Sequence, residues 1–280
     1  MNMSENNSNY PTLHLEEDRE VVFNRKANFL FMALSTFFIA SALIAEFVGV
    51  KVFSVEKSLG LASNVQLLGM NLPSLNLTTG ALLWPIVFIM SDIINEYFGT
   101  RGVRILSYIT AILISYAFLI IFFAMALTPA DFWIMRQSEA GPVNMEVAFE
   151  AIFGQGMWII VGSLVAFIIG QVVDVTIFHH IKRLTGERHL WLRATGSTLV
   201  SQLIDTYIVL IIAFHINPQT NWDLGLIFVI GTTKYIYKFI MAIALTPLIY
   251  IVHILIDEYL GEETATRLKQ HAMQDRRTFI

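Results

Sequence analysis

The sequence contains no cysteine and few charged residues. The absence of cysteine among 280 residues excludes disulfides, thiolate metal sites and cysteine nucleophiles. Only 14% of the residues are charged, against about 25% in typical soluble domains, and the mean hydropathy is +0.62. The charges gather near the two ends of the chain and in short connectors between long apolar runs. These features predict an integral membrane protein.

Several catalytic motifs are also missing. The sequence has no G-x-x-x-x-G-K-[ST] loop, no G-x-S-x-G elbow and no H-E-x-x-H pair, so none of the corresponding enzyme classes is indicated. No histidine pair stands at ligand spacing, and the net charge of −4 gives no nucleic-acid footprint. We therefore expect no enzymatic activity, no cofactor, no bound metal and no nucleic-acid partner.

Apolar runs long enough to cross a bilayer recur along the chain. A transmembrane helix needs about 20 predominantly apolar residues. Six stretches meet this requirement: roughly 28–50, 77–97, 103–127, 155–178, 196–216 and 224–256. The segment 52–76, rich in glycine and asparagine, reads as a loop or a short interfacial helix. The sequence thus predicts a six-helix membrane domain over 28–257, with polar cytoplasmic tails at 1–27 and 258–280.

Lysine and arginine indicate the orientation of these spans. Cytoplasmic loops carry the excess of basic residues. With the N-terminus inside, 13 basic residues fall on the cytoplasmic side, 3 fall outside and 2 lie within a span. The sequence therefore predicts a multi-pass protein of the cell inner membrane with both termini in the cytoplasm.

A Gln-x-x-Asp pattern occurs twice inside apolar spans, as Gln171 with Asp174 and as Gln202 with Asp205. Ionisable groups at membrane depth cost several kcal/mol, so they usually face a cavity or one another. Small residues at four-residue steps (Gly162, Ala166, Gly170) precede the first pair and would let a neighbouring helix approach closely.

Two further polar pairs lie inside spans. Asp92 and Glu96 stand four residues apart, as do Lys234 and Lys238, and this spacing places each pair on one helical face. All eight polar residues are candidates for contact with a substrate. They are Gln171, Asp174, Gln202, Asp205, Asp92, Glu96, Lys234 and Lys238.

A purely structural role is the alternative for these residues. At about 1.5 Å of rise per residue, Asp205 and Lys234 both come near the midplane. The expected ion pairs are then Asp205 with Lys234 and Asp174 with Lys238, and they would lock helix packing. Asp92 and Glu96 would be interfacial charges near the arginines at 101 and 104.

The stretch GALLWPIVFIMSDIINEYFGTRGVR, residues 80–104, resembles the queuosine precursor transporter family, formerly described as vitamin uptake transporters. The resemblance extends to both Gln-x-x-Asp pairs and to YIYKFIMAIALTP, and it covers roughly 28–257. Two departures are the long 52–76 segment and Glu46, where the family leads us to expect asparagine. The matching residues of the first stretch are Gly80, Pro85, Asp92, Glu96, Tyr97, Phe98, Gly99, Arg101 and Arg104.

This resemblance implies a fold similar to the substrate-binding components of energy-coupling-factor transporters. It also implies import of 7-deazaguanine bases, such as 7-cyano-7-deazaguanine, 7-aminomethyl-7-deazaguanine or queuine, for salvage into tRNA modification. A guanine-like edge offers N1–H and N2–H₂ as donors and O6 as an acceptor, which carboxylate and amide side chains complement. Aromatic neighbours could stack on the flat base, for about 1–3 kcal/mol.

Other functions stay open at this stage. The chain could transport a vitamin or another nucleobase, act as a membrane enzyme, or serve as a structural subunit whose buried charges only join helices. It could also be a binding component that needs a separate ATPase module. The expected partners are a small deazapurine and the lipid bilayer, and a homo-oligomer is left open.

Overall fold

Long apolar helices make up most of the protein. A computed structural model describes residues 10–60, 66–67, 70–71, 76–139, 141–154, 157–186, 189–218 and 220–274. In these residues, five helical stretches are long and apolar enough to cross a membrane. The main helices are α1 (Tyr10–Val48), α3 (Trp84–Met125), α6 (Met157–Thr185), α7 (Leu190–Leu210) and α8 (Leu224–Leu260). The predicted all-α integral membrane class is confirmed.

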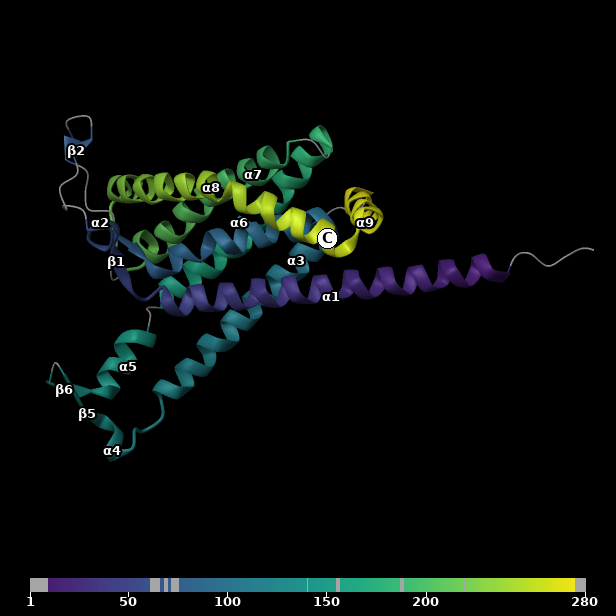
Figure 1. Cartoon of the computed structure of the whole chain (residues 1–280). Helices are drawn as coiled ribbons and strands as arrows, with labels where there is room; N and C mark the ends of the chain where they lie inside the picture. The colour runs from purple at the N-terminus through teal and green to yellow at the C-terminus, as the bar shows by residue number, and fades with distance from the viewer. Residues whose placement is uncertain are drawn as a thin grey trace, which may run out of the picture.

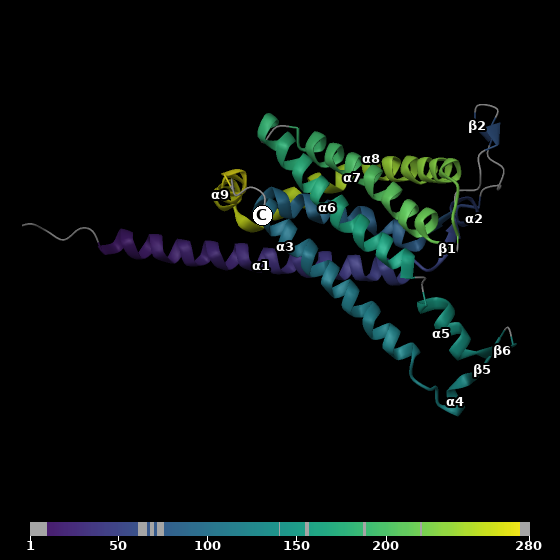
Figure 2. The same cartoon turned by 180° about the vertical axis from the view of Figure 1, so that it is seen from behind.

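Helix α3 contains two of the predicted spans within one element. The apolar stretch that contains it, Thr79–Met125, runs for 47 residues, about twice what one crossing requires. Gly99 interrupts it with φ 77° and ψ 178°, a backbone conformation that glycine adopts without steric cost. The second arm then runs back toward the end at which the first arm began (Figures 1 and 2). The first arm of α3 therefore covers most of the span expected at 77–97, and the second arm covers nearly all of the span expected at 103–127.

The helices pack through small residues in the middle and expose apolar side chains on the outside. A Cβ added at Gly162 would lie 3.3 Å from the Val209 carbonyl oxygen, and one added at Gly170 would lie 3.5 Å from Asp205 Cβ. The close approach expected of this stripe is confirmed, and the neighbour is α7. Large apolar side chains such as Phe37 and Ile112 are more than half exposed, as suits residues that face lipid.

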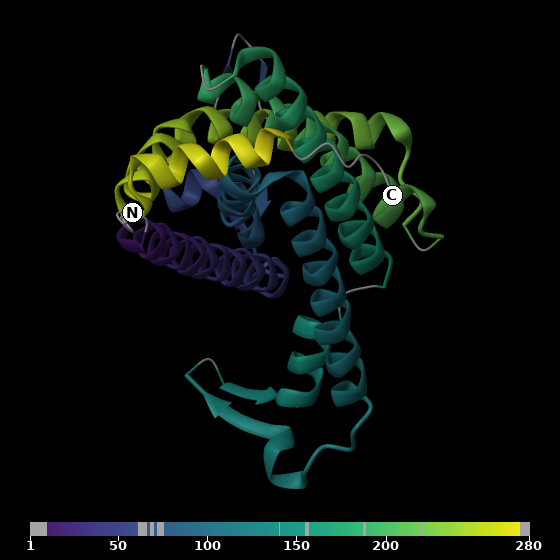
Figure 3. The ribbon, with the colours of Figure 1, turned by 90° about the vertical axis from the view of Figure 1, so that its right-hand side faces the viewer.

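One end of the bundle carries the start of α1, the Gly99 bend and helix α9 (Glu262–Gln274) (Figures 1 and 3). Both described ends of the chain thus lie at the same end, as an even number of crossings requires. Helix α1 begins at Tyr10, within the segment expected to be a tail. The Cβ of Ala272 in α9 lies 3.7 Å from an ideal Cβ at Gly99, so α9 packs directly on the bend.

The opposite end carries short elements (Figure 1). Strand β1 (Val52–Ser54) pairs antiparallel with β4 (Asn76–Thr78), which places the two ends of the 52–76 segment side by side. Part of that segment lies outside the described residues. The remaining short elements are α2 (Val55–Ser58), β2 (Gln66–Leu67), β3 (Met70–Asn71), η1 (Thr79–Leu82), α4 (Asp131–Ile134), β5 (Met135–Ser138), β6 (Gly141–Asn144), α5 (Met145–Phe153) and the π-helical η2 (Ile211–Ile216).

Candidate functional site

A cavity of about 450 Å³ lies between the helices toward the end that carries β1 and β4. This volume falls within the roughly 300–1,000 Å³ of small-molecule sites. Residues from α1, α3, α6, α7 and α8 all contribute to its wall, and we call it the outer cavity. Its polar and aromatic lining consists of Glu46, Ser163, Asp205, Lys234, Lys238, Trp84, Phe214 and Tyr237, among others.

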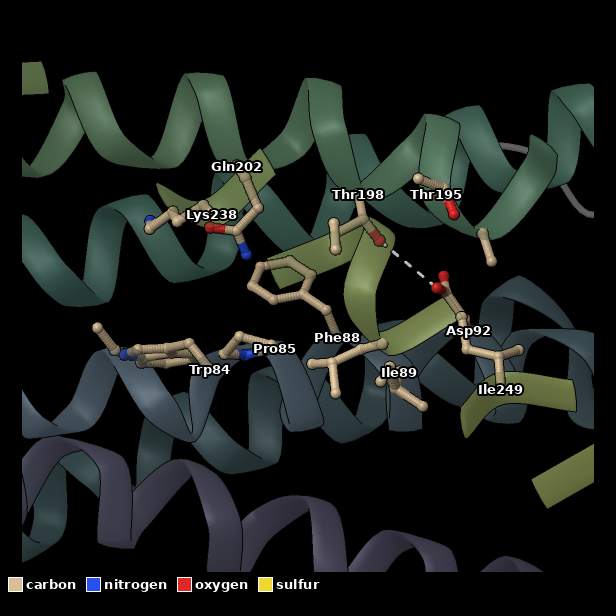
Figure 4. A pocket seen from close by; sticks show the side chains of 14 residues that line it. Trp84, Pro85, Phe88, Ile89, Asp92, Thr195, Thr198, Gln202, Lys238 and Ile249 are labelled. Carbon is tan, nitrogen blue, oxygen red and sulfur yellow. Dashed lines mark hydrogen bonds between the residues drawn. The ribbon is translucent and has the colours of Figure 1, made fainter. Parts of the chain in front are cut away.

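A narrower space continues from the outer cavity toward the other end, and we call it the inner pocket. The two share Trp84 and Lys238 in their walls. The inner pocket has room for little more than a water molecule, at about 20 Å³. Figure 4 shows Gln202 and Phe88 projecting into it, with Asp92 at its far side. The outer cavity is thus large enough for a small organic molecule, whereas the inner pocket in this conformation is not.

Asp205 of α7 pairs with Lys238 of α8. Asp205 Oδ2 and Lys238 Nζ are 2.6 Å apart, and each side chain is 18% exposed. The expected pairing of Asp205 with Lys234 is wrong. That pairing was based on the depth of the two backbones alone, and it took no account of the length and direction of the lysine side chain. Helical side chains lean toward the N-terminus of their helix, so a lysine one turn further along α8 reaches back to Asp205.

Asp174 has hydroxyl partners in place of the expected lysine. Ser201 donates to its Oδ1 at 3.1 Å, and Ser91 donates to its Oδ2 at 3.4 Å. Asp174 is fully buried between α3, α6 and α7, so the predicted pair with Lys238 is wrong. Asp92 accepts a long hydrogen bond of 3.5 Å from Thr198, while no donor to its Oδ1 is found among the described residues. Of these two acids, Asp92 alone lines the inner pocket.

Glu96 forms a buried cluster with two cations from other helices. Lys182 Nζ of α6 lies 3.1 Å from Glu96 Oε2, and Arg193 Nη2 of α7 lies 2.8 Å from Oε1. All three side chains are at most 3% exposed. The alternative of an interfacial charge near the arginines at 101 and 104 is therefore wrong. The cluster joins α3, α6 and α7 and lies outside both cavities.

The two glutamines of the Gln-x-x-Asp pairs have different surroundings. The amide of Gln202 projects into the inner pocket (Figure 4), and its Oε1 has no hydrogen-bond partner. Neither polar atom of the Gln171 amide has a partner. Gln171 lies against Ser107 and Tyr108, where there is no room for water. The structure thus brings Gln202, Asp205, Asp92, Lys234 and Lys238 to the cavities, but not Gln171, Asp174 or Glu96.

Sequence reasoning missed Glu46 and Ser163 as cavity residues. Ser163 Oγ of α6 donates to Glu46 Oε1 of α1 at 2.8 Å, and both line the outer cavity. A carboxylate near the end of an apolar span was the available signal, but Glu46 stood out only as a departure from the family pattern. Trp84, which lines both spaces, was also not singled out.

An integral membrane protein with a cavity between its helices, lined by apolar and ionisable side chains, is the class that this geometry defines. Residues 78–252 match the family described as "Putative vitamin uptake transporter". The match covers well over half of the chain, so the protein belongs to that family.

Named relatives agree with this assignment. A "Probable queuosine precursor transporter" of Bacillus subtilis is 31% identical over 206 residues, which is 73% of this chain and 81% of the relative. A "Probable queuosine precursor transporter" of Haemophilus influenzae is 22% identical over 61% of this chain and 66% of its own length. The "Queuosine precursor transporter" of Escherichia coli is 28% identical over 51% of this chain and 57% of its own length. No solved structure matches the chain.

Proposed function

We propose that the protein imports queuosine precursors, namely 7-deazaguanine bases such as 7-cyano-7-deazaguanine, 7-aminomethyl-7-deazaguanine or queuine. The observation that carries the proposal is the outer cavity, whose volume suits one flat base and whose wall combines carboxylates, ammonium groups and aromatic rings. Similarity to relatives named queuosine precursor transporters supports this substrate class.

Five of the candidate residues would meet the base along its route. Lys234, Asp205 and Lys238 line the outer cavity, and Asp92, Gln202 and again Lys238 line the inner pocket. Trp84 stands in the wall of both spaces and offers an indole on which a base can stack. We assign Gln171, Asp174 and Glu96 to helix packing, because none of them reaches either space.

We base the proposed orientation of the chain on the distribution of its basic residues. We propose that the end with α9 faces the cytoplasm and that the outer cavity faces outward, in the cell inner membrane. The base would then enter between α1 and α8 and leave past Asp92. We propose no catalytic step and no cofactor, since the proposed task is movement of an unchanged base across the bilayer.

Uptake in cells that cannot synthesise queuosine precursors tests the function. Such cells receive this chain or an empty vector, and accumulation of labelled 7-cyano-7-deazaguanine is measured at early times. Accumulation well above the vector level, reduced by unlabelled deazaguanines and not by unlabelled vitamins, is expected. Uptake no higher than the vector level, with the protein present in the membrane, would contradict the proposal. Competition by a vitamin alone would favour the vitamin alternative.

A further inference from the structure

Among the described residues, two charged side chains of the outer cavity have no ion-pair partner of opposite charge. Four acidic or basic side chains line this cavity: Glu46, Asp205, Lys234 and Lys238. Asp205 and Lys238 neutralise each other at 2.6 Å. Within the described part of the chain, neither Glu46 nor Lys234 has an ion-pair partner at 4 Å or less. The cavity therefore holds one carboxylate and one ammonium group that are available to a ligand.

Ser163 holds the Glu46 carboxyl at the cavity wall. Its hydroxyl donates to Glu46 Oε1 at 2.8 Å, which fixes the carboxyl between α1 and α6. The side chain of Glu46 stays only partly buried, and no hydrogen bond to Oε2 is found among the described residues. An ionised carboxylate has about four lone-pair sites, so Glu46 can accept two more donors from a bound molecule.

Lys234 is the complementary group on α8. Its side chain has no hydrogen bond within the described residues and is partly buried. The neighbouring cation Lys238, one turn away, is occupied by Asp205. Lys234 can therefore donate to an acceptor on a bound molecule, and an ammonium group at low dielectric makes a strong charge-assisted hydrogen bond.

The close contact between α1 and η1 keeps Glu46 in place. An ideal Cβ on Gly80 would lie 2.4 Å from the Ala45 carbonyl oxygen and 3.3 Å from Gly49 Cα. Only glycine permits this approach, which brings the outer end of α1 against η1, just before the first arm of α3. Glu46 follows Ala45 directly, so its position depends on this contact.

We infer that Glu46 and Lys234 together bind the polar edge of a 2-amino-4-oxo pyrimidine ring, and that Glu46 makes the cavity selective for bases with the 2-amino group. The inference deepens the proposed function and rests on it. The carboxylate of Glu46 accepts from the ring N–H and the exocyclic amine, and Lys234 donates to the ring carbonyl oxygen. A hypoxanthine-type ring lacks the amine and leaves one acceptor oxygen unmatched. An adenine-type ring places a donor where Lys234 also donates.

Direct binding to the purified full-length protein tests this pairing. The probes are 7-cyano-7-deazaguanine and its analogue without the 2-amino group, each measured on the parent, Glu46→Gln, Lys234→Met and Glu150→Gln. Glu150→Gln makes the same chemical change at an exposed position of α5 and serves as the matched control. Melting curves of each variant check that it is folded.

The parent and the control should bind the amino base about tenfold more tightly than the analogue, the value of one good hydrogen bond to a charged group. Glu46→Gln replaces one acceptor oxygen of the carboxylate with an amide N–H donor. This variant should bind the amino base about tenfold more weakly and lose most of the preference for the amino base over the analogue. Lys234→Met should weaken both bases alike, because both retain the carbonyl oxygen.

The outcomes separate this inference from the proposed function. If the parent binds neither base, the proposed function falls. If the parent binds the amino base but does not prefer it over the analogue, or if folded Glu46→Gln keeps the preference, only the present inference is overturned. If Glu46→Gln fails to fold, the inference depends on the other two results. The parent must prefer the amino base over the analogue, and Lys234→Met must weaken the binding of both bases.

Discussion

Asp205 and Lys238 link α7 to α8 through a 2.6 Å ion pair where the outer cavity meets the inner pocket. Lys238 belongs to the wall of both spaces, whereas Asp205 lines only the outer one. On the proposed route, a base that moves inward would pass this pair. The pair has access to cavity water, since each side chain is 18% exposed, so it can open at a lower cost than a dry pair.

A double-mutant cycle should reveal the coupling of this pair. Removal of one partner from a fully buried pair costs about 3–5 kcal/mol, and the exposure of Asp205 and Lys238 should reduce that cost. We expect Lys238→Met and Asp205→Asn each to lower the melting temperature of the purified protein. The double variant should recover part of the loss, because it leaves no uncompensated charge.

Lys234→Met is the matched control for this cycle. It removes a lysine one turn away that has no ion pair among the described residues. Its melting temperature should stay close to that of the parent. Equal destabilisation by Lys234→Met and Lys238→Met would show that the pairing seen here does not contribute to stability.

The Glu96 cluster should be essential for folding. Glu96→Gln leaves Lys182 and Arg193 without their carboxylate at sites that are at most 3% exposed. Breaking such a buried cluster costs about 3–5 kcal/mol, so the level of protein in the membrane should fall sharply. Glu258→Gln changes an exposed glutamate of α8 in the same way and should leave the level unchanged. Normal levels of Glu96→Gln would contradict a structural role.

Cysteine labelling should establish the orientation, because the parent chain has no cysteine to interfere. Arg136 is an exposed residue of β5 and Gln270 is an exposed residue of α9, at opposite ends of the bundle (Figure 1). In intact spheroplasts, which expose the outer face, a membrane-impermeant maleimide should label Arg136→Cys. In inside-out inner-membrane vesicles, which expose the cytoplasmic face, it should label Gln270→Cys. The reverse pattern would invert the proposed direction of the outer cavity.

Gly80 should tolerate no side chain. An added methyl group would lie 2.4 Å from the Ala45 carbonyl oxygen, and relief of such a clash requires backbone movement that costs about 1–3 kcal/mol. Gly80→Ala should therefore lower the melting temperature and also reduce uptake, since Glu46 moves with α1. Gly196→Ala meets only the flexible end of Ile181 at 3.4 Å and should be harmless. Equal behaviour of the two variants would contradict the role of this contact.

The sequence was sufficient for the architecture but not for the cavity. Length and hydropathy located the membrane helices, and the spacing of Gly162 and Gly170 identified a close helix contact, because both signals are local. Ion-pair partners depend on how far side chains reach between helices, so the assignment of Lys234 to Asp205 failed. Glu46 was missed because it is available to a bound molecule only if no lysine or arginine pairs with it. Among the described residues, only the fold shows that none does.

The two Gln-x-x-Asp motifs show the same limit. Gln171 and Gln202 have identical local sequence spacing, yet Gln202 faces the inner pocket while Gln171 is enclosed beside Ser107 and Tyr108. The pattern predicts that an amide lies on the same face as the acid three residues later. It contains no information about which helix covers that face.

This difference yields a paired prediction for the two glutamines. Gln202→Leu removes an amide that projects into the inner pocket and should lower uptake of 7-cyano-7-deazaguanine severalfold while the melting temperature stays near that of the parent. Gln171→Leu removes two buried polar atoms without partners, whose desolvation costs about 1–3 kcal/mol. It should therefore keep uptake and hold or raise the melting temperature. Both quantities are measured for both variants at matched membrane levels. Loss of uptake in a stable Gln171→Leu variant, with Gln202→Leu fully active, would place the route of the base on the other side of α6.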